Sequence, residues 1–402
     1  MRLRLLLLAL GTFAVGTDGM VTAGILPLVA RDLTVSISVA GQMVTVFALA
    51  YGVLAPVLAT VTARWPRRNA LLTGLAVFTV ANALTALAPS YGVLLGTRVL
   101  AAVGAALYTP TASAVATSLV PPERRGRAIA TVMGGLTVAT ALGVPLGTWI
   151  GRTDWRLTMW LVTGLGAAAF AGLAALLREL PQPAAALTLR ERLAPLADRR
   201  VLGAAATTFL IFVAFQTTYI YYTVATYPAT GGSQDRLTLL LLVSGIAAVL
   251  GSQLGGRLVD AWGPRVVVLS ALAAYAAVAA AAPWMLRTMP TALAAAVVTP
   301  VIGWALAVAQ ITRITSIAPA DAPVLVSLSS SATYLGMAAA GGTGSLALEL
   351  FGDRWFLLAG AGIAVLALGV AAVTTAGGVP VEGRRQVRVS GGLSRPRGGA
   401  AH

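Results

Sequence analysis

The chain has 402 residues, of which 58% are hydrophobic and only 10% are charged, and its mean hydropathy is +0.85. Soluble domains carry about 25% charged residues, so this composition excludes a soluble protein and indicates several membrane-spanning segments. No cysteine is present and the single histidine is the last residue, His402, which excludes disulfides, thiolate chemistry and histidine-based catalysis or metal ligation.

All 28 basic residues are arginines, and the formal net charge is +15. Most of them lie in short loops between apolar runs, which is typical of membrane topology rather than of a nucleic-acid-binding surface. We therefore expect no nucleic-acid partner, no metal and no other cofactor.

Twelve apolar segments can be marked along the chain, and each is long enough to cross a hydrocarbon layer of about 30 Å as a helix. The sequence therefore predicts an all-α membrane protein with twelve transmembrane helices. The segments are 5–30, 36–61, 69–88, 91–119, 128–150, 157–177, 201–228, 237–259, 265–286, 289–312, 322–347 and 355–376.

The arginines predict the orientation of these segments. If the N-terminus lies in the cytoplasm and the segments alternate, 21 arginines fall inside, 6 fall outside, and Arg98 lies within the membrane. This ratio satisfies the positive-inside rule. We expect a multi-pass protein of the inner or plasma membrane with both termini in the cytoplasm.

The first segment, 5–30, carries one formal charge, Asp18, near the predicted midplane. A carboxylate there costs about 2.5–3.5 kcal/mol even on the lenient insertion scale, and such residues are usually functional. Burial disfavours the charged form, so a cycle of protonation is feasible. The alternative is a permanently protonated Asp that is hydrogen-bonded, for example to Thr22 one turn later. Arg98 is a fixed positive charge that could bias Asp18, or it is a structural or snorkelling arginine.

The longest internal loop, 178–200, divides six segments from six. ARWPRR at 63–68 and DAWGPR at 260–265 each close an apolar run, and their tryptophans are 197 residues apart. A duplicated six-helix unit is a known transporter design with its substrate site near the midplane. We predict two bundles, 1–177 and 201–376, a cytoplasmic linker over 178–200, and a basic, disordered cytoplasmic tail over 377–402.

The seventh segment contains FLIFVAFQTTYIYYT at 209–223, in which polar and aromatic residues recur at three-residue spacing. Such a stripe suits a cavity for an amphiphilic organic substrate. Packing and interfacial anchoring are the alternatives for each side chain. The candidate cavity residues are Thr22, Gln216, Tyr219, Tyr222, Trp304, Gln310 and Tyr334.

Four motifs carry a resemblance to a known family: GGRLVDAWGPR at 255–265, ATVTARWPRR at 59–68, GVPLGT at 143–148 and RVLAAVGAA at 98–106. Together they resemble the major facilitator superfamily, and within it the drug:proton antiporter-like exporters that include chloramphenicol and arabinose efflux permeases. The resemblance covers residues 5–376 and implies two pseudo-symmetric six-helix bundles. It also implies an acid in the first helix as a proton or substrate site, although the family pattern places Glu where this chain has Gly19.

The motifs also supply candidate gating residues. Asp260 at a helix end could pair with an arginine and cap a neighbouring helix, which would latch one gate state. The first-half motif has Ala59 and Ala63 where the family has Gly and Asp, and its arginines could simply hold topology. GVPLGT permits close helix packing with or without a gating role. The candidates are Arg64, Arg67, Arg68, Gly143, Pro145, Gly147, Gly256, Asp260, Gly263 and Arg265.

We expect a proton-coupled secondary transporter that exports a small amphiphilic or hydrophobic compound, such as a drug or antibiotic, by alternating access. Its partners would be the substrate, protons and membrane lipids, and we expect a monomer. The alternatives are efflux of a sugar, nucleoside or amino-acid-like metabolite, and a transport-inactive membrane receptor. An enzyme is not expected, because the chain shows no cluster of catalytic acids, His or Cys near a membrane interface.

Overall fold

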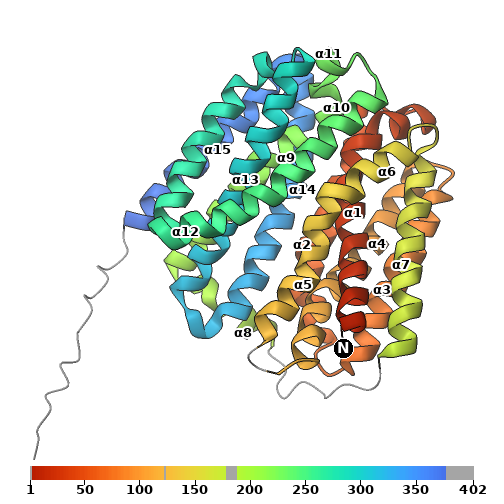
Figure 1. The fold of residues 1–402 in the computed structure, drawn as a ribbon, viewed down its shortest axis with the longest axis vertical. Helices are drawn as coiled ribbons and strands as arrows, with labels where there is room; N and C mark the ends of the chain where they lie inside the picture. The colour runs from red at the N-terminus through yellow and green to blue at the C-terminus, as the bar shows by residue number, and fades with distance from the viewer. Residues whose placement is uncertain (1, 122–123, 178–187, 377–402) are drawn as a thin grey trace, which may run out of the picture.

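The computed structural model describes residues 2–121, 124–177 and 188–376, and all secondary structure in these ranges is helical (Figure 1). The predicted tail over 377–402 and the first part of the predicted linker, 178–187, lie outside the described residues. The rest of the linker begins with a short helix, α8 (Leu189–Leu193), and a 3₁₀ turn, η3 (Ala194–Ala197).

The first half contains five long helices and one interrupted helix. The long helices are α1 (Arg2–Asp32), α2 (Ile37–Val61), α3 (Arg67–Ala86), α4 (Tyr91–Ser118) and α7 (Trp155–Leu176). The interrupted helix consists of α5 (Arg125–Val138), the π-helical turn η2 (Ala139–Gly143) and α6 (Val144–Ile150). The π turn ends two residues before Pro145, which has no N–H to donate to the preceding turn, and π turns often mark functional sites.

The second half begins with α9 (Arg199–Ile220). Two short helices follow α9, and four long helices follow these. The short helices are α10 (Tyr222–Ala225) and α11 (Tyr227–Thr230). The long helices are α12 (Gln234–Met285), α13 (Met289–Ile317), α14 (Ala322–Trp355) and α15 (Leu357–Ala376), with a 3₁₀ turn η4 (Pro319–Asp321) before α14.

Eleven of the described helices are long and apolar enough to cross a membrane. One of them, α12, has 52 residues, which corresponds to about 78 Å and more than twice the thickness of the hydrocarbon layer. Its helical geometry breaks at Gly263, which has φ 78° and ψ 156°, a conformation that glycine adopts without steric cost, and Pro264 follows. Because α12 therefore makes two crossings, the described helices give the twelve that the sequence predicts.

The two halves lie side by side in Figure 1, with α1–α7 on one side and α9–α15 on the other. Helices α2 and α14 run along the boundary. One buried cluster belongs almost entirely to the first half and includes Phe78 and Tyr108. Another joins the halves and includes Ile25, Met43 and Phe356. The chain thus folds as two six-helix bundles that share a packed interface, as the sequence predicts.

Candidate functional site

Asp18 and Arg98 form a buried ion pair inside the first half. The Arg98 guanidinium donates from Nη1 to Asp18 Oδ1 at 2.8 Å and from Nη2 to Asp18 Oδ2 at 2.9 Å. The Asp18 and Arg98 side chains are 0% and 2% exposed. This fork-to-fork geometry is the strong form of an Arg–carboxylate contact, and it neutralises both deep charges.

Two further groups surround the guanidinium of Arg98. Its Nη1 donates to Asn82 Oδ1 at 3.4 Å, and its central carbon lies 4.7 Å from the centre of the Phe47 ring. Its Nε is buried and has no hydrogen-bond partner among the described residues. The arginine therefore depends on the Asp18 carboxylate for its only full counter-charge in this part of the structure.

The GVPLGT motif holds the helix that carries Asp18. A Cβ atom added at Gly143 would lie 2.0 Å from Thr17 Oγ1, and one added at Gly147 would lie 2.6 Å from Val21 Cγ2. Only glycine allows η2 and α6 to approach α1 this closely. The small residues of the motif therefore fix α1 just before and just after Asp18.

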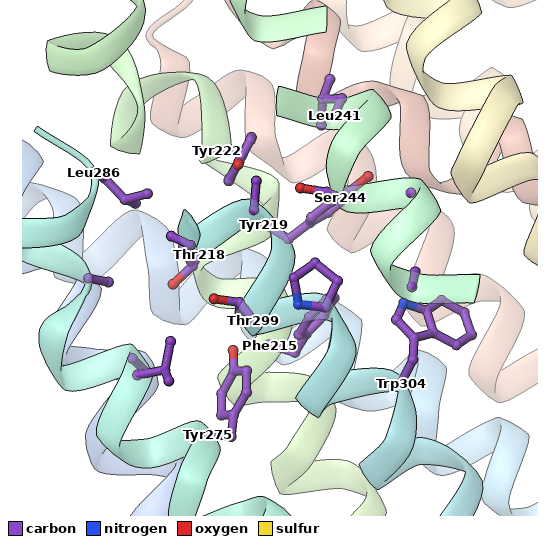
Figure 2. A pocket seen from close by; sticks show the side chains of 18 of the residues that line it. Phe215, Thr218, Tyr219, Tyr222, Leu241, Ser244, Tyr275, Leu286, Thr299 and Trp304 are labelled. Atoms are coloured by element: carbon purple, nitrogen blue, oxygen red, sulfur yellow. The ribbon is translucent and has the colours of Figure 1, made fainter. Parts of the chain in front are cut away.

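A cavity of about 880 Å³, with the open space at its mouth included, lies mainly within the second half (Figure 2). Its walls come mainly from α9, α10, both crossings of α12 and α13, and Figure 2 shows side chains of these helices converging on it. Five large rings line it: Phe215, Tyr219, Tyr222, Tyr275 and Trp304.

The polar groups of the cavity are uncharged. Hydroxyls from Thr218, Ser244 and Thr299 line it, and none of the described lining residues is Asp, Glu, Lys, Arg or His. The first half contributes only Met20 and Thr140. An adjoining cavity of about 540 Å³ also includes Met20 among its lining residues.

The structure separates the cavity residues expected from the sequence into two groups. Tyr219, Tyr222 and Trp304 line the larger cavity, whereas Thr22, Gln216, Gln310 and Tyr334 are not among its lining residues. Thr22 and Gln216 are buried within their bundles.

The remaining two residues of the second group have other partners. The Gln310 amide donates to the Ala204 carbonyl at 2.7 Å within the second half. Tyr334 stacks on Tyr51 across the boundary with a ring-centre distance of 3.6 Å.

Several lining residues were missed by the sequence analysis, among them Met20, Phe215, Ser244, Tyr275 and Thr299. The sequence of the eighth segment does indicate part of the lining. Its cavity residues follow the i, i+3, i+4, i+7 spacing of one helix face: Leu241, Ser244, Gly245 and Ala248. Tyr275 gives no such signal, because it is one aromatic residue in a run of alanines.

The arginines of the first-half motif contact helix ends. Arg68 donates from Nε to the Leu177 carbonyl at 2.7 Å and from Nη2 to the Ala174 carbonyl at 3.0 Å. Arg67 donates to the Ala114 carbonyl of α4 at 3.4 Å. A cation at the C-terminus of α7 satisfies carbonyls that the helix leaves unpaired.

The second-half motif makes a different arrangement. Asp260 is exposed, and no ion pair formed among the described residues includes Asp260 or Arg265. Gly263 supplies the break in α12, and a Cβ added at Gly256 would meet open space. The predicted latch is therefore not formed in this structure.

The halves are closed at the end of the molecule where α1 ends and α2 begins, which we term the closed end. There, the Ser38 hydroxyl of α2 donates to Glu349 Oε1 of α14 at 2.7 Å and also contacts Ser345. The Tyr221 hydroxyl donates to the Gly341 carbonyl at 3.0 Å while contacting Gly41 closely enough to leave no room for a Cβ.

Towards the opposite end, no residue of α2 from Val53 to Val61 is buried, whereas nine residues between Ser38 and Gly52 are buried. Val53, Val57 and Val61 are 50%, 37% and 64% exposed. Helix α8 of the linker packs against α2 there, and Arg192 Nη2 donates to the Ala59 carbonyl at 3.3 Å. The contacts between the halves are therefore concentrated towards the closed end.

Two acids outside the membrane-spanning helices have a pKa below the ordinary value. Hydrogen bonds from the backbone and side chain of Thr188 hold the pKa of Glu191 below its ordinary value and complete a capping box on α8. Hydrogen bonds from the Arg200 side chain and backbone lower the pKa of Asp198, which caps α9. The first cap starts the short helix α8 and the second starts α9, the first long helix of the second half.

Two six-helix halves, a charge pair buried in one and an uncharged cavity in the other define the architecture of a membrane transporter. The family model described as Major Facilitator Superfamily matches residues 8–323, and the chain belongs to this family. The family consists of multi-pass secondary transporters of small molecules and not of enzymes.

Curated relatives support the same assignment. The chain is 35% identical over 259 residues to the inner membrane transport protein YdhP of Escherichia coli strain K12, with 64% of this chain and 66% of that protein covered. It is 35% identical over 270 residues to a chloramphenicol resistance protein of Streptomyces lividans, with 65% and 67% covered. It is 32% identical over 271 residues to a chloramphenicol efflux pump of Mycobacterium tuberculosis strain H37Rv, with 66% and 65% covered. The chain thus spans about two thirds of the length of these relatives.

Solved structures show the same fold at low identity. A bacterial homologue of the human lysosomal transporter Spinster, inward-facing and unoccupied, gives a TM-score of 0.72 at 19% identity, covering 93% of this chain and 96% of that one. A point mutant of the nucleoside transporter NupG gives a TM-score of 0.74 at 13% identity, covering 92% and 99%. These likenesses establish the two-bundle fold alone.

Proposed function

We propose that this chain is a proton-coupled secondary transporter that exports a small amphiphilic or hydrophobic compound by alternating access. The observation that carries the proposal is the bidentate ion pair between Asp18 and Arg98, fully buried in the membrane-spanning part of the first half. A carboxylate at such depth is costly and is usually retained for function.

The pair gives protonation a structural effect. Protonation of Asp18 removes its negative charge and one of its two acceptor positions, which leaves the Arg98 guanidinium without a full counter-charge. The two helices that carry the pair, α1 and α4, would then separate or rotate. In the proposed cycle, protonation from outside releases the substrate, and deprotonation to the cytoplasm resets the site.

The distribution of contacts between the halves supports alternating access. With the N-terminus in the cytoplasm, as the arginine distribution predicts, the closed end faces outward and the exposed end of α2 faces the cytoplasm. This arrangement is the one from which a cytoplasmic compound would be collected. The proposed latch at Asp260 and Arg265 would then form in the opposite, outward-open state.

Export of a drug-like compound is supported by relatives named for chloramphenicol resistance and efflux. It is also supported by the aromatic, uncharged lining of the cavity. We place the protein in the cell membrane with both termini in the cytoplasm and propose that it works as a monomer.

Efflux of a polar metabolite such as a nucleoside is the second candidate. The hydroxyls of Thr218, Ser244 and Thr299 in the cavity wall favour it. The five large rings favour the amphiphilic compound, and so does the lack of any charged or amide side chain among the described lining residues.

Purified protein in liposomes tests the proposal. Chloramphenicol added on the cytoplasmic side should trigger a pH change that is present in the wild type and absent in Asp18→Asn. Asp353→Asn is the matched control, because Asp353 is an exposed acid and no ion pair among the described residues includes it. Full proton-driven transport by Asp18→Asn would refute the coupling role, and a nucleoside-triggered signal without a chloramphenicol signal would favour the second candidate.

A further inference from the structure

Helix α1 separates the ion pair from the cavity. Asp18 and Met20 are two residues apart, so their side chains project about 200° apart around the helix. Asp18 faces Arg98 in the first half, whereas Met20 lines both cavities of the second half. One helix therefore presents the charged site on one face and the cavity on the opposite face.

The cavity excludes direct charge recognition. Its described lining holds rings, hydroxyls and aliphatic groups but no acid or base. A permanently charged ligand would lose its hydration there without meeting a counter-charge. Ring faces attract cations, but this attraction is smaller than the cost of removing an ion from water. An uncharged compound with an aromatic ring does not have to lose the hydration of a charge, and its ring can stack in offset geometry against the tyrosines and Trp304.

The second half also binds the backbone of α1 beside Met20. The Tyr219 hydroxyl donates to the Met20 carbonyl at 3.4 Å, and the Thr223 hydroxyl donates to the Ala23 carbonyl at 2.6 Å. Because Tyr219 itself lines the cavity, a ligand that moves its ring also pulls on α1.

Close packing on α1 limits how such a movement can be absorbed. At Gly143 and Gly147 the neighbouring helix leaves no space for even a methyl group beside Thr17 and Val21. Close-packed interiors transmit displacement rather than dissipate it. With α1 held at Thr17 and Val21, a push on Met20 is carried along the helix backbone to Asp18, two residues away, past Gly19, where an added Cβ would meet nothing within 4 Å.

We propose that the cavity of the second half binds the uncharged, ring-bearing part of the exported compound, and that Met20 transmits its occupancy through α1 to the Asp18–Arg98 pair. This inference rests on the proposed function, but it replaces direct competition for Asp18 with indirect coupling between the two faces of one helix. The substrate then never touches the carboxyl group that carries the proton.

Binding to the purified full-length protein in detergent tests the site. The probes are chloramphenicol and florfenicol, which are uncharged, and ethidium, which is a permanent aromatic cation. We expect chloramphenicol affinity to fall by about tenfold or more in Trp304→Ala. Ser244→Ala should also weaken binding.

The matched control is Trp160→Ala, since Trp160 is 42% exposed on α7 and does not line the cavity. Wild-type affinity in Trp304→Ala, ethidium binding as tight as chloramphenicol binding, or failure of both uncharged probes to bind would each overturn the proposal.

The coupling is tested separately by proton release on binding, starting from protein equilibrated at acidic pH so that Asp18 carries its proton. Chloramphenicol is added to saturation, so that differences in affinity between variants do not affect the result. Met20→Ala should release fewer protons per bound ligand than the wild type, and Met20→Leu should restore most of the release. Met133→Ala is the control, because Met133 is a partly buried methionine on α5 that does not line the cavity.

Wild-type release in Met20→Ala would overturn the coupling route. Absence of release in the wild type itself would instead refute the proposed proton-coupled function, while the binding measurements would still decide whether the cavity is the ligand site.

Discussion

The Asp18 carboxylate and the Arg98 guanidinium meet through two parallel hydrogen bonds of 2.8 and 2.9 Å, and these bonds join α1 to α4 inside the first half. Both residues are almost fully buried, so neither charge can be satisfied by water if its partner is removed.

The first prediction concerns the stability of this pair. Removing one partner from a buried ion pair typically costs about 3–5 kcal/mol, because the remaining charge stays buried. We expect Asp18→Ala and Arg98→Ala each to lower the unfolding temperature in detergent, and Asp18→Leu with Arg98→Met to recover much of the loss. Thermal unfolding of the three variants checks this, and a double variant less stable than both single ones would contradict it.

The second prediction concerns the close packing at Gly143. Gly143→Ala places a methyl group against Thr17 Oγ1, so we expect lower stability and weaker transport. Thr17→Ala in the same chain removes the clashing oxygen and should restore part of both. Gly134→Ala serves as the control because a Cβ there meets nothing within 4 Å. Equal effects at positions 134 and 143 would show that helix glycines matter here for reasons other than packing.

The third prediction concerns Arg68. Its two hydrogen bonds to the end of α7 involve a charged donor, and each such bond is worth roughly 1.5–3 kcal/mol. Arg68→Ala should therefore reduce the unfolding temperature, whereas Arg64→Ala should not, because Arg64 is exposed. If both variants unfold at the wild-type temperature, the hydrogen bonds of Arg68 do not stabilise the fold.

The fourth prediction uses the natural absence of cysteine. Ser38 and Ser345 are in contact across the closed end, so cysteines at both positions should form a disulfide under mild oxidation. If the closed end must open during each cycle, oxidation should stop transport and a reductant should restore it. Each single cysteine variant is the control, and unchanged transport by the cross-linked protein would exclude opening at this end.

The fifth prediction concerns acid sensitivity at the start of α9. Arg200 lowers the pKa of Asp198 from its ordinary value of 3.8. The ionised form of Asp198 is therefore favoured more strongly in the folded protein than in the unfolded chain. Its contribution to stability is complete above the unfolded pKa and is lost as the pH falls through the lower folded pKa. The difference in unfolding temperature between wild type and Asp198→Asn should be constant near pH 6–7 and shrink below about pH 4. A difference that grows on acidification would contradict this assignment.

The fold could be predicted from the sequence because each crossing is a long apolar run and the arginines mark the loops. The boundary at Gly263 was also predictable, since the motif at 260–265 places Gly-Pro between two apolar runs, and both residues disfavour a continuous helix. Length, composition and local breaks are properties of the chain itself and need no knowledge of packing.

The candidate site was predictable only in part. Tyr219, Tyr222 and Trp304 line the cavity, but Gln310 bonds to Ala204 and Tyr334 stacks on Tyr51. The rotation of each helix decides which of its polar residues face the cavity, and helices that are apolar all round carry little signal of that rotation. The roles of these residues, and of Asp18 and Arg98, stay predictions.

All but two of the residues that line the larger cavity come from the second half, while the ion pair lies wholly in the first. Substitutions that reshape the cavity therefore leave the proton-carrying carboxyl group and its arginine untouched. A lineage can change the compounds that such a protein accepts without rebuilding the means by which transport is driven, and the two properties are open to separate selection.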